Sequence, residues 1–311
     1  MRRPIIVVFF SLFLMAFQAL AAERGALFKV TAGANALYLY GTIHAGRPDF
    51  YPLEPRIREA MAAAPTLALE VDMTGDQAAI AAAMFKHGMF APGTPGLAGL
   101  PAERRQRIES ALKQNGIEPA AVAQLKPWML VMTLAVIDAA KLGYDPKLGV
   151  DAHLAGLARA SGKTRIAELE SMEYQASLLN RLPVEEQWKL LEETLDNMAS
   201  GRQVREAREL FAAYESADQA ALERIAQRME EDDSLGGKFM RELLMDERNG
   251  PMADKIASLL ARENNAVVAV GLLHLVGKRG VPELLRKRGI KVERCTEEGL
   301  LQEGSGALDV D

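Results

Sequence analysis

The two ends of the chain carry the same arrangement of sequence motifs. Near the start, a β-prone run ending at Tyr40 leads into Gly41-Thr42-Ile43-His44, and near the end the run Ala266 to Val270 leads into Gly271-Leu272-Leu273-His274. In both places a proline then opens a predicted helix, and another β-prone run follows. Strand, helix and strand in this order form a β-α-β unit with parallel strands. The sequence therefore predicts an α/β fold with a central mixed sheet built from two β-α-β halves.

The two halves of the predicted sheet occupy about residues 27–72 and 264–295. In the first half, a hairpin is predicted around residues 33–35, a helix over 54–63 and a strand over 66–72. Between the halves, about residues 74–262 show apolar residues at helical spacing, interrupted by one strand-like run over 164–170. We expect one domain over residues 22–311, with this large, mainly helical segment as an insertion.

The first 21 residues have the features of a signal peptide. Arg2 and Arg3 precede an apolar run over residues 5–17, and Ala19-Leu20-Ala21 has the small-x-small pattern of a cleavage site. The run falls short of the roughly 20 apolar residues that cross a bilayer. We expect a protein secreted across the inner membrane, periplasmic, starting at Ala22 and without a stable membrane span. A retained N-terminal anchor is the alternative.

The charge balance limits the partners that we expect. The chain has 37 basic and 42 acidic residues, and loss of Arg2 and Arg3 would make the exported protein more acidic. A net negative charge disfavours general attraction to nucleic acid, so no nucleic-acid partner is expected. The single cysteine, Cys295, excludes an internal disulfide. A small-molecule or peptide substrate is expected, and neither its identity nor the oligomeric state follows from the sequence.

Two of the four histidines follow a predicted strand in the same setting. In an open α/β sheet, ligands bind outside the carboxyl ends of the parallel strands, and His44 and His274 are both expected there. Gly41 and Gly271 are predicted to let the backbone bend sharply or a ligand approach closely. Two convergent imidazoles suit a first-row transition metal. The pattern therefore predicts a metal site.

Acidic residues at strand ends could complete this site. In the predicted strand 66–72, period-2 alternation places Glu70 and Asp72 on one face, and burying both without a partner would be costly. Glu70 is the preferred third ligand or general base, with Asp72 close behind it. Glu168 and Glu170 share a face of the strand 164–170 in the same way, and Glu170 is the weaker candidate.

Structural roles remain open for each of these residues. A single G-x-x-H is a weak motif, because a histidine at a strand end often only hydrogen-bonds a loop; the pair in matching contexts favours a site. His87 and His153 are predicted to be structural, His87 as a helix-end residue. The sequence contains no H-E-x-x-H, G-x-S-x-G or C-x-x-C motif.

Taken together, the motifs resemble the TraB/GumN family, which is related to the TIKI membrane-tethered proteases and placed near the erythromycin-esterase and ChaN-like folds. The resemblance covers about residues 27–294 and rests on the order and spacing of its motifs. These are Gly41 to His44, Leu69 to Asp72, Gly149 to Leu154, Leu169-Glu170, Glu247 to Asn249 and Gly271 to Gly277.

The resemblance implies a divalent-metal site formed by His44, His274 and Glu70, with manganese or cobalt suggested by the TIKI relatives and zinc also to be tested. Arg248 and Asn249 match the Glu-Arg-Asn motif. Arg248 could hold a substrate carboxylate or an oxyanion, and Asn249 could donate a hydrogen bond. Capping the helix from about Met252 is an equally open role for Asn249.

These observations lead to three functional hypotheses. The first is an exported metal-dependent hydrolase, peptidase-like if the TIKI resemblance extends to chemistry, in which the metal activates water and Glu70 or its neighbour takes the proton. The second is a non-enzymatic haem- or metal-binding protein on the same scaffold. The third is an assembly or regulatory partner in envelope or exopolysaccharide biology.

Overall fold

The computed structural model describes residues 23–295, so the predicted signal peptide lies outside the described residues. Within this range the strands form one mixed sheet in the order β4-β3-β5-β2-β1-β6. The strands are β1 (Leu27–Ala32), β2 (Asn35–Thr42), β3 (Thr66–Leu69), β4 (Arg165–Glu168), β5 (Ala266–Gly271) and β6 (Lys291–Arg294). The predicted α/β class with a mixed sheet is confirmed.

The two predicted halves of the sheet meet at its centre. β2 and β5 pair in parallel, and β3 joins the other edge of β5, also in parallel. β1 runs antiparallel to β2 as the predicted hairpin, with Gly33 at a positive φ of 58° in its turn. β4 comes from inside the predicted insertion and extends the sheet beyond β3.

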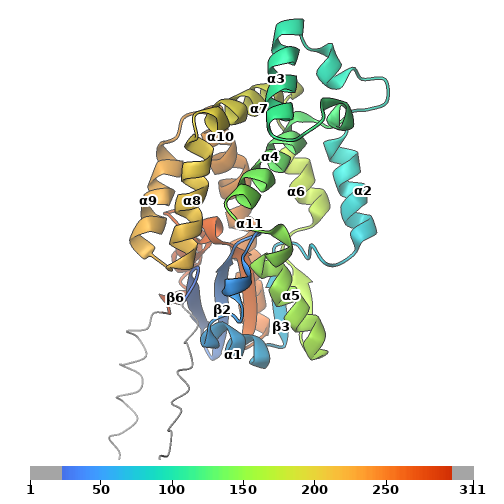
Figure 1. Ribbon diagram of the computed structural model, residues 1–311. Coiled ribbons are helices and arrows are strands. Elements are labelled where there is room, and N and C mark those ends of the chain that lie inside the picture. The colour runs from blue at the N-terminus through green and yellow to red at the C-terminus, as the bar shows by residue number, and fades with distance from the viewer. Residues whose placement is uncertain (1–22, 296–311) are drawn as a thin grey trace, which may run out of the picture.

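Helices make up most of the segment between the two halves of the sheet, as predicted. Figure 1 shows the sheet in the lower half of the molecule and most of the insertion above it. The helices are α1 (Pro55–Ala63), α2 (Gln77–Gly88), α3 (Ala102–Gln114), α4 (Pro127–Lys141), α5 (Val150–Ser161), α6 (Met172–Leu179), α7 (Val184–Ala199), α8 (Arg202–Glu215), α9 (Gln219–Glu231), α10 (Leu235–Lys238), α11 (Glu247–Arg262) and α12 (Val281–Lys287).

Two hydrophobic cores hold the sheet and the helices together. The larger core surrounds the sheet, where every residue from Ala266 to Val270 in β5 is buried, as expected for a strand covered on both faces. The smaller core lies within the insertion and joins α3, α4 and α7 through residues such as Leu112, Leu134 and Leu191. The site described below lies at the sheet edge beneath the insertion.

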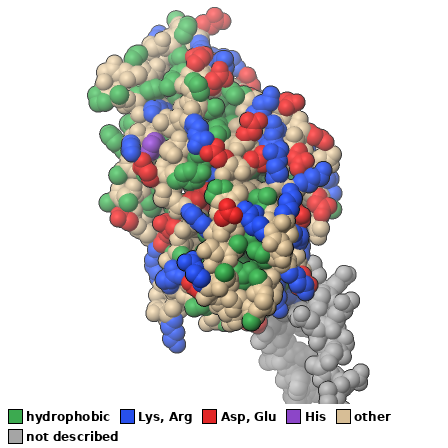
Figure 2. Space-filling model, turned by 180° about the vertical axis from the view of Figure 1, so that it is seen from behind, with side chains coloured by type: hydrophobic (Ala, Val, Ile, Leu, Met, Phe, Trp, Pro, Cys, Tyr) green, Lys and Arg blue, Asp and Glu red, His purple; other side chains and the backbone are tan. Residues whose placement is uncertain are grey.

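The surface carries charges of both signs. Figure 2 shows basic and acidic side chains interspersed over the back of the molecule, with apolar side chains between them. None of the helices between residues 23 and 295 combines the length and apolarity that crossing a membrane requires.

Candidate functional site

Both G-x-x-H segments leave the sheet at the same edge. In the parallel β2–β5 ladder, Gly41 pairs with Val270 and Thr42 with Gly271, so the segments leading to His44 and His274 start side by side. β3 and β4 end at this edge as well, since both run parallel to β5 in the same sheet. The parallel topology therefore gathers residues from four strand ends.

Two glutamates lie next to each other beyond the ends of β3 and β4. The parallel hydrogen bonding continues past the strands, because the Leu169 N–H donates to Leu69 O at 2.7 Å and the Glu170 N–H donates to Glu70 O at 2.8 Å. The ladder pairs Leu69 with Glu168, so its register would place Glu70 opposite Leu169. The second of these bonds shifts the pairing by one residue and brings Glu170 opposite Glu70, and both glutamates are buried. This one-residue shift brings together two carboxylates that are separated by 100 positions in the sequence.

The prediction that Glu70 and Asp72 share a strand face is wrong. β3 ends at Leu69. Beyond it, Glu70 contacts the buried Arg248, whereas Asp72 pairs with the exposed Arg159. The same holds for the other predicted strand, which ends at the exposed Glu168 before the buried Glu170. Asp72 is therefore not part of the candidate site.

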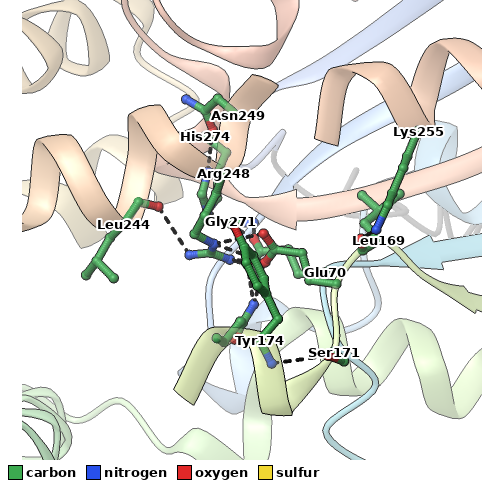
Figure 3. Close-up of polar contacts among 12 residues, drawn as sticks. Glu70, Leu169, Ser171, Tyr174, Leu244, Arg248, Asn249, Lys255, Gly271 and His274 are labelled. Carbon is green, nitrogen blue, oxygen red and sulfur yellow. Dashed lines mark hydrogen bonds and ion pairs between the residues drawn. The ribbon is translucent and has the colours of Figure 1, made fainter. Parts of the chain in front are cut away.

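A buried guanidinium joins the two glutamates (Figure 3). Arg248 Nη2 donates to Glu70 Oε2 at 2.6 Å and to Glu170 Oε2 at 2.7 Å, and its Nε donates to Glu170 Oε2 at 3.0 Å. Its Nη1 donates to Leu244 O at 3.2 Å, within the π-helical segment Phe239–Asp246 that precedes α11. Burial would lower the pKa of Arg248, but hydrogen bonds and charge from both glutamates outweigh it and raise the pKa. Arg248 is therefore already engaged with protein acceptors.

The other oxygen of Glu70 faces the second G-x-x-H segment. Glu70 Oε1 accepts a hydrogen bond from the Gly271 N–H and lies 3.6 Å from His274 Nε2. Burial alone would raise the pKa of Glu70, but the positive charges of His274, Arg248 and His44 and the Gly271 hydrogen bond lower it to about 2. Among these groups, Arg248 keeps its positive charge at every pH at which the protein is folded. Glu70 is therefore ionised at neutral pH.

His274 is oriented by Asn249. The Asn249 amide nitrogen donates to Arg279 O at 2.9 Å, which leaves Asn249 Oδ1 to accept from His274 Nδ1 at 2.6 Å. This hydrogen bond assigns the proton of the neutral ring to Nδ1 and leaves a lone pair on Nε2, which faces Glu70. Burial lowers the pKa of His274 to about 4, so the ring is neutral at pH 7. Asn249 lies inside α11, so its alternative role as a helix cap is wrong.

His44 is oriented in the same manner by a different residue. Its Nδ1 lies 3.1 Å from Asp151 Oδ1, at the start of α5, and the carboxylate can only accept. The Asp151 charge raises the pKa of His44. The His44 side chain is 69% exposed, whereas that of His274 is 3% exposed, so one histidine faces solvent and the other lies within the protein.

Gly271 leaves an open space between these donor groups. A Cβ atom placed on Gly271 would lie 3.1 Å from Glu70 Oε1, 3.6 Å from His274 Cδ2 and 3.7 Å from His44 Nε2. All three predicted ligands therefore border one small region that a side chain at position 271 would fill. Gly41 does not border this region. A Cβ atom on Gly41 would lie 2.7 Å from Leu272 Cδ1, so the glycine allows the close packing of Leu272 against β2.

The proposed ligands His44, His274 and Glu70 border one region, but their donor atoms are not arranged as a metal-binding cluster. Among residues 23–295, no group of three or more His, Cys, Asp and Glu side chains is arranged to hold a metal as it stands. The remaining histidines lie elsewhere: His87 Nε2 lies 2.8 Å from Glu173 Oε1, and the His153 ring packs against the Tyr51 ring at a tilt of 32°, with centroids 4.0 Å apart.

Sequence reasoning missed two residues of this site. Asp151 orients His44, and Gln175 of α6 donates to Glu170 Oε2 at 2.9 Å. Asp151 carried a signal, since it is an acidic residue in the Gly149 to Leu154 motif. Gln175 carried none, because its place beside the glutamates depends on how α6 packs.

Comparisons with known proteins match most of the residues that the structure describes. A model of the TraB/PrgY/gumN family matches residues 26–294. Two relatives described as "Uncharacterized protein YbaP", from Escherichia coli (strain K12) and Shigella flexneri, are each 27% identical to this chain over 267 residues. The matches cover 82% of this chain and 89% of each relative. No solved structure matches the chain.

Proposed function

The chain belongs to the TraB/PrgY/gumN family, and from this premise and the geometry of the site we propose that it is an exported, divalent-metal-dependent hydrolase. His44, His274 and Glu70 are the proposed ligands, and manganese, cobalt or zinc the proposed metal. Peptide-type amide bonds are the substrates to test first, followed by small-molecule esters and amides. The supporting observation is that both histidines are oriented toward the region beside Gly271.

The orientation of the histidines carries the proposal. A histidine that binds a metal through Nε2 almost always donates its Nδ1–H to a carboxylate or another oxygen acceptor, which fixes the ring and its tautomer. His44 does so to Asp151 and His274 to Asn249. The Nε2 atom of His44 and the ring of His274 border the space beside Gly271, together with a Glu70 oxygen. The chemistry of the donor set fits a divalent first-row metal.

The charges of the site support the same conclusion. At neutral pH the His274 ring is neutral, whereas the Asp151 charge raises the pKa of His44 to about 9 and keeps that ring protonated. A metal bound through His44 Nε2 would take the place of the second proton of that ring. The contacting groups would then comprise three carboxylates, Glu70, Glu170 and Asp151, and one guanidinium, Arg248. Buried negative charge is costly unless a cation compensates it. A divalent cation between His44, His274 and Glu70 would balance this excess.

The proposed metal ion and the surrounding side chains would each have a different role in hydrolysis. A divalent ion bound here would supply Lewis acidity, which polarises a carbonyl and lowers the pKa of water. Arg248 keeps Glu70 ionised and fixed, and Asn249 and Asp151 hold the two rings. The low pKa makes Glu70 a weak base, so the role of ligand suits it better than that of proton acceptor. A contact of Arg248 with substrate stays a prediction.

Metal loading and activity measured together test this function. We expect purified protein to bind about one equivalent of manganese, cobalt or zinc and to hydrolyse at least one member of a panel of peptides, amides and esters. The His44→Ala, His274→Ala double variant should lose both properties, and a chelator should abolish hydrolysis by the unaltered protein. His87→Ala, which removes a histidine that contacts Glu173 away from the proposed site, is the matched control.

The outcomes separate the hypotheses. Stoichiometric metal binding without hydrolysis of any substrate would favour a metal-binding protein over an enzyme. A Soret band on haem titration that disappears in the double variant would favour a haem carrier. Equal metal content and equal activity in the double variant and in His87→Ala would contradict the proposal.

Export is the second part of the proposal. The supporting observation is the basic start, apolar run and small-x-small pattern in residues 1–21. We expect protein recovered from the periplasm of a bacterial host to begin at Ala22. N-terminal sequencing that finds Met1 in this fraction would instead favour a retained anchor.

A further inference from the structure

Lys255 is a basic residue that contacts the main chain beside the candidate site. It lies in α11, seven residues after Arg248, and seven residues make almost two turns of an α-helix. The two basic side chains therefore lie on the same face of α11. Arg248 contacts the carboxylate of Glu170, and the ammonium group of Lys255 donates to the main-chain oxygen of Leu169 (Figure 3). One face of α11 thus contacts two consecutive residues of the chain.

The hydrogen bonding of Leu169 departs from the regular ladder between β3 and β4. Leu69 lies opposite Glu168 and accepts from the Leu169 N–H at 2.7 Å. In a regular parallel ladder, the Leu169 oxygen would next accept from the N–H of Val71. In the structure the ammonium group of Lys255 donates to this oxygen instead. Because Leu169 is buried and a buried carbonyl needs a partner, Lys255 replaces the donor that the ladder would supply.

The same departure pairs the two glutamates of the site. If the ladder continued, Glu70 would lie opposite Leu169, whereas the shift of one residue brings Glu170 opposite Glu70. Both carboxylates contact Arg248 in this arrangement. An extra residue accommodated at the end of a strand commonly re-aims a side chain next to an active site. A contact that stabilises the shift therefore also stabilises the pair of carboxylates.

We propose that Lys255 is a positioning residue for the candidate site. Its ammonium group holds Leu169 in the shifted register. Through this contact it keeps the Glu170 carboxylate beside Glu70 and Arg248. Without the ammonium group, the ladder would be free to continue in its regular register, and Glu170 would move away from the guanidinium. This positioning does not require a metal, whereas its effect on metal affinity rests on the proposed function.

Melting temperatures of variants of the full chain test the positioning of Glu170. Lys255→Met keeps the length of the side chain but removes the ammonium group, and should lower the melting temperature by about 2–4 °C. Lys255→Arg keeps a cationic donor and should restore most of this loss. In a Glu170→Ala background, Lys255→Met should have less than half of its effect, because the carboxylate that it positions is absent. Lys189→Met, which removes an exposed ammonium group paired with Glu186, is the control.

Metal affinity separates positioning from a purely structural role. In folded protein, Lys255→Met should weaken the binding of cobalt or zinc by about tenfold, the lower end of the usual effect of changes around metal ligands, and Lys255→Arg should restore it. In the Glu170→Ala background, Lys255→Met should have no further effect on affinity. If the unaltered protein binds no metal, the proposed function fails, and the melting temperatures alone decide whether Lys255 positions Glu170.

Two outcomes would overturn the positioning role. The first is an equal loss of melting temperature on Lys255→Met with and without the Glu170 side chain, since Lys255 would then act independently of this carboxylate. The second, in protein that binds metal, is a Lys255→Met variant with lower stability but the same affinity as Lys189→Met. Lys255 would then contribute to the fold alone.

Discussion

Replacing Arg248 with alanine is expected to lower the free energy of unfolding by about 3–5 kcal/mol, which is the usual cost of removing one partner of a buried ion pair. Glu70 and Glu170 would then remain buried next to each other without their shared counter-charge. The loss exceeds that of a surface pair, since water cannot replace the guanidinium at either carboxylate. Urea unfolding at neutral pH, followed by circular dichroism, measures the change.

An exposed arginine provides the control for this measurement. Arg181 pairs with Glu247, and their side chains are 49% and 35% exposed, so Arg181→Ala should cost only about 0–1 kcal/mol. Adding Glu170→Gln to Arg248→Ala should recover part of the lost stability, because one buried charge is removed. Equal unfolding free energies for Arg248→Ala and Arg181→Ala would show that the two buried carboxylates do not depend on Arg248.

Replacing Gly271 with alanine is expected to weaken metal binding by about 100-fold while the fold is retained, which is the upper end of the usual effect of changes around metal ligands. All three proposed ligands would still be present. The new methyl group, however, would occupy the space that they border, 3.1 Å from Glu70 Oε1 and 3.7 Å from His44 Nε2. The backbone at Gly271, with φ of −53° and ψ of 136°, allows alanine without strain. Titration with cobalt or zinc measures the affinity.

Gly156 is the matched control for this substitution. It lies in α5, and a Cβ there would meet nothing within 4 Å. Gly156→Ala should leave metal affinity unchanged and raise stability by about 0.5–1 kcal/mol, the usual gain from replacing a helical glycine. Metal affinity in Gly271→Ala equal to that in Gly156→Ala would place the ion somewhere other than beside Gly271.

The fold was predictable from the sequence where local patterns determine it. The hairpin before His44, the buried run of β5 and the glycine that ends α5 all have local signals, and the structure contains each of them. The ends of β3 and β4 were not predictable in this way. The alternating pattern continues through Glu70 and Glu170, but the strands end before them, and both side chains contact Arg248 of a distant helix.

In the candidate site, too, the residues at strand ends were predictable from the sequence, whereas the residues that orient them were not. His44, Glu70 and His274 follow strands in a parallel sheet, and topology alone brings such residues to one edge. The groups that orient them come from distant helices, Asp151 from α5 and Asn249 from α11. The sequence does not show which side chain of a helix will face a given histidine, since helix packing determines it. Arg248 was expected to face a substrate, yet most of its donors are bound to protein oxygens.

The location of a bound ion tests the central proposal most directly. Crystals of the protein loaded with zinc or cobalt, with data collected on both sides of the metal absorption edge, would reveal that location. We expect one anomalous peak about 2.0–2.2 Å from His44 Nε2, His274 Nε2 and a Glu70 oxygen, the usual distances for such ligands. A fully loaded protein whose ion lies elsewhere, or crystals without an ion at saturating metal, would contradict it.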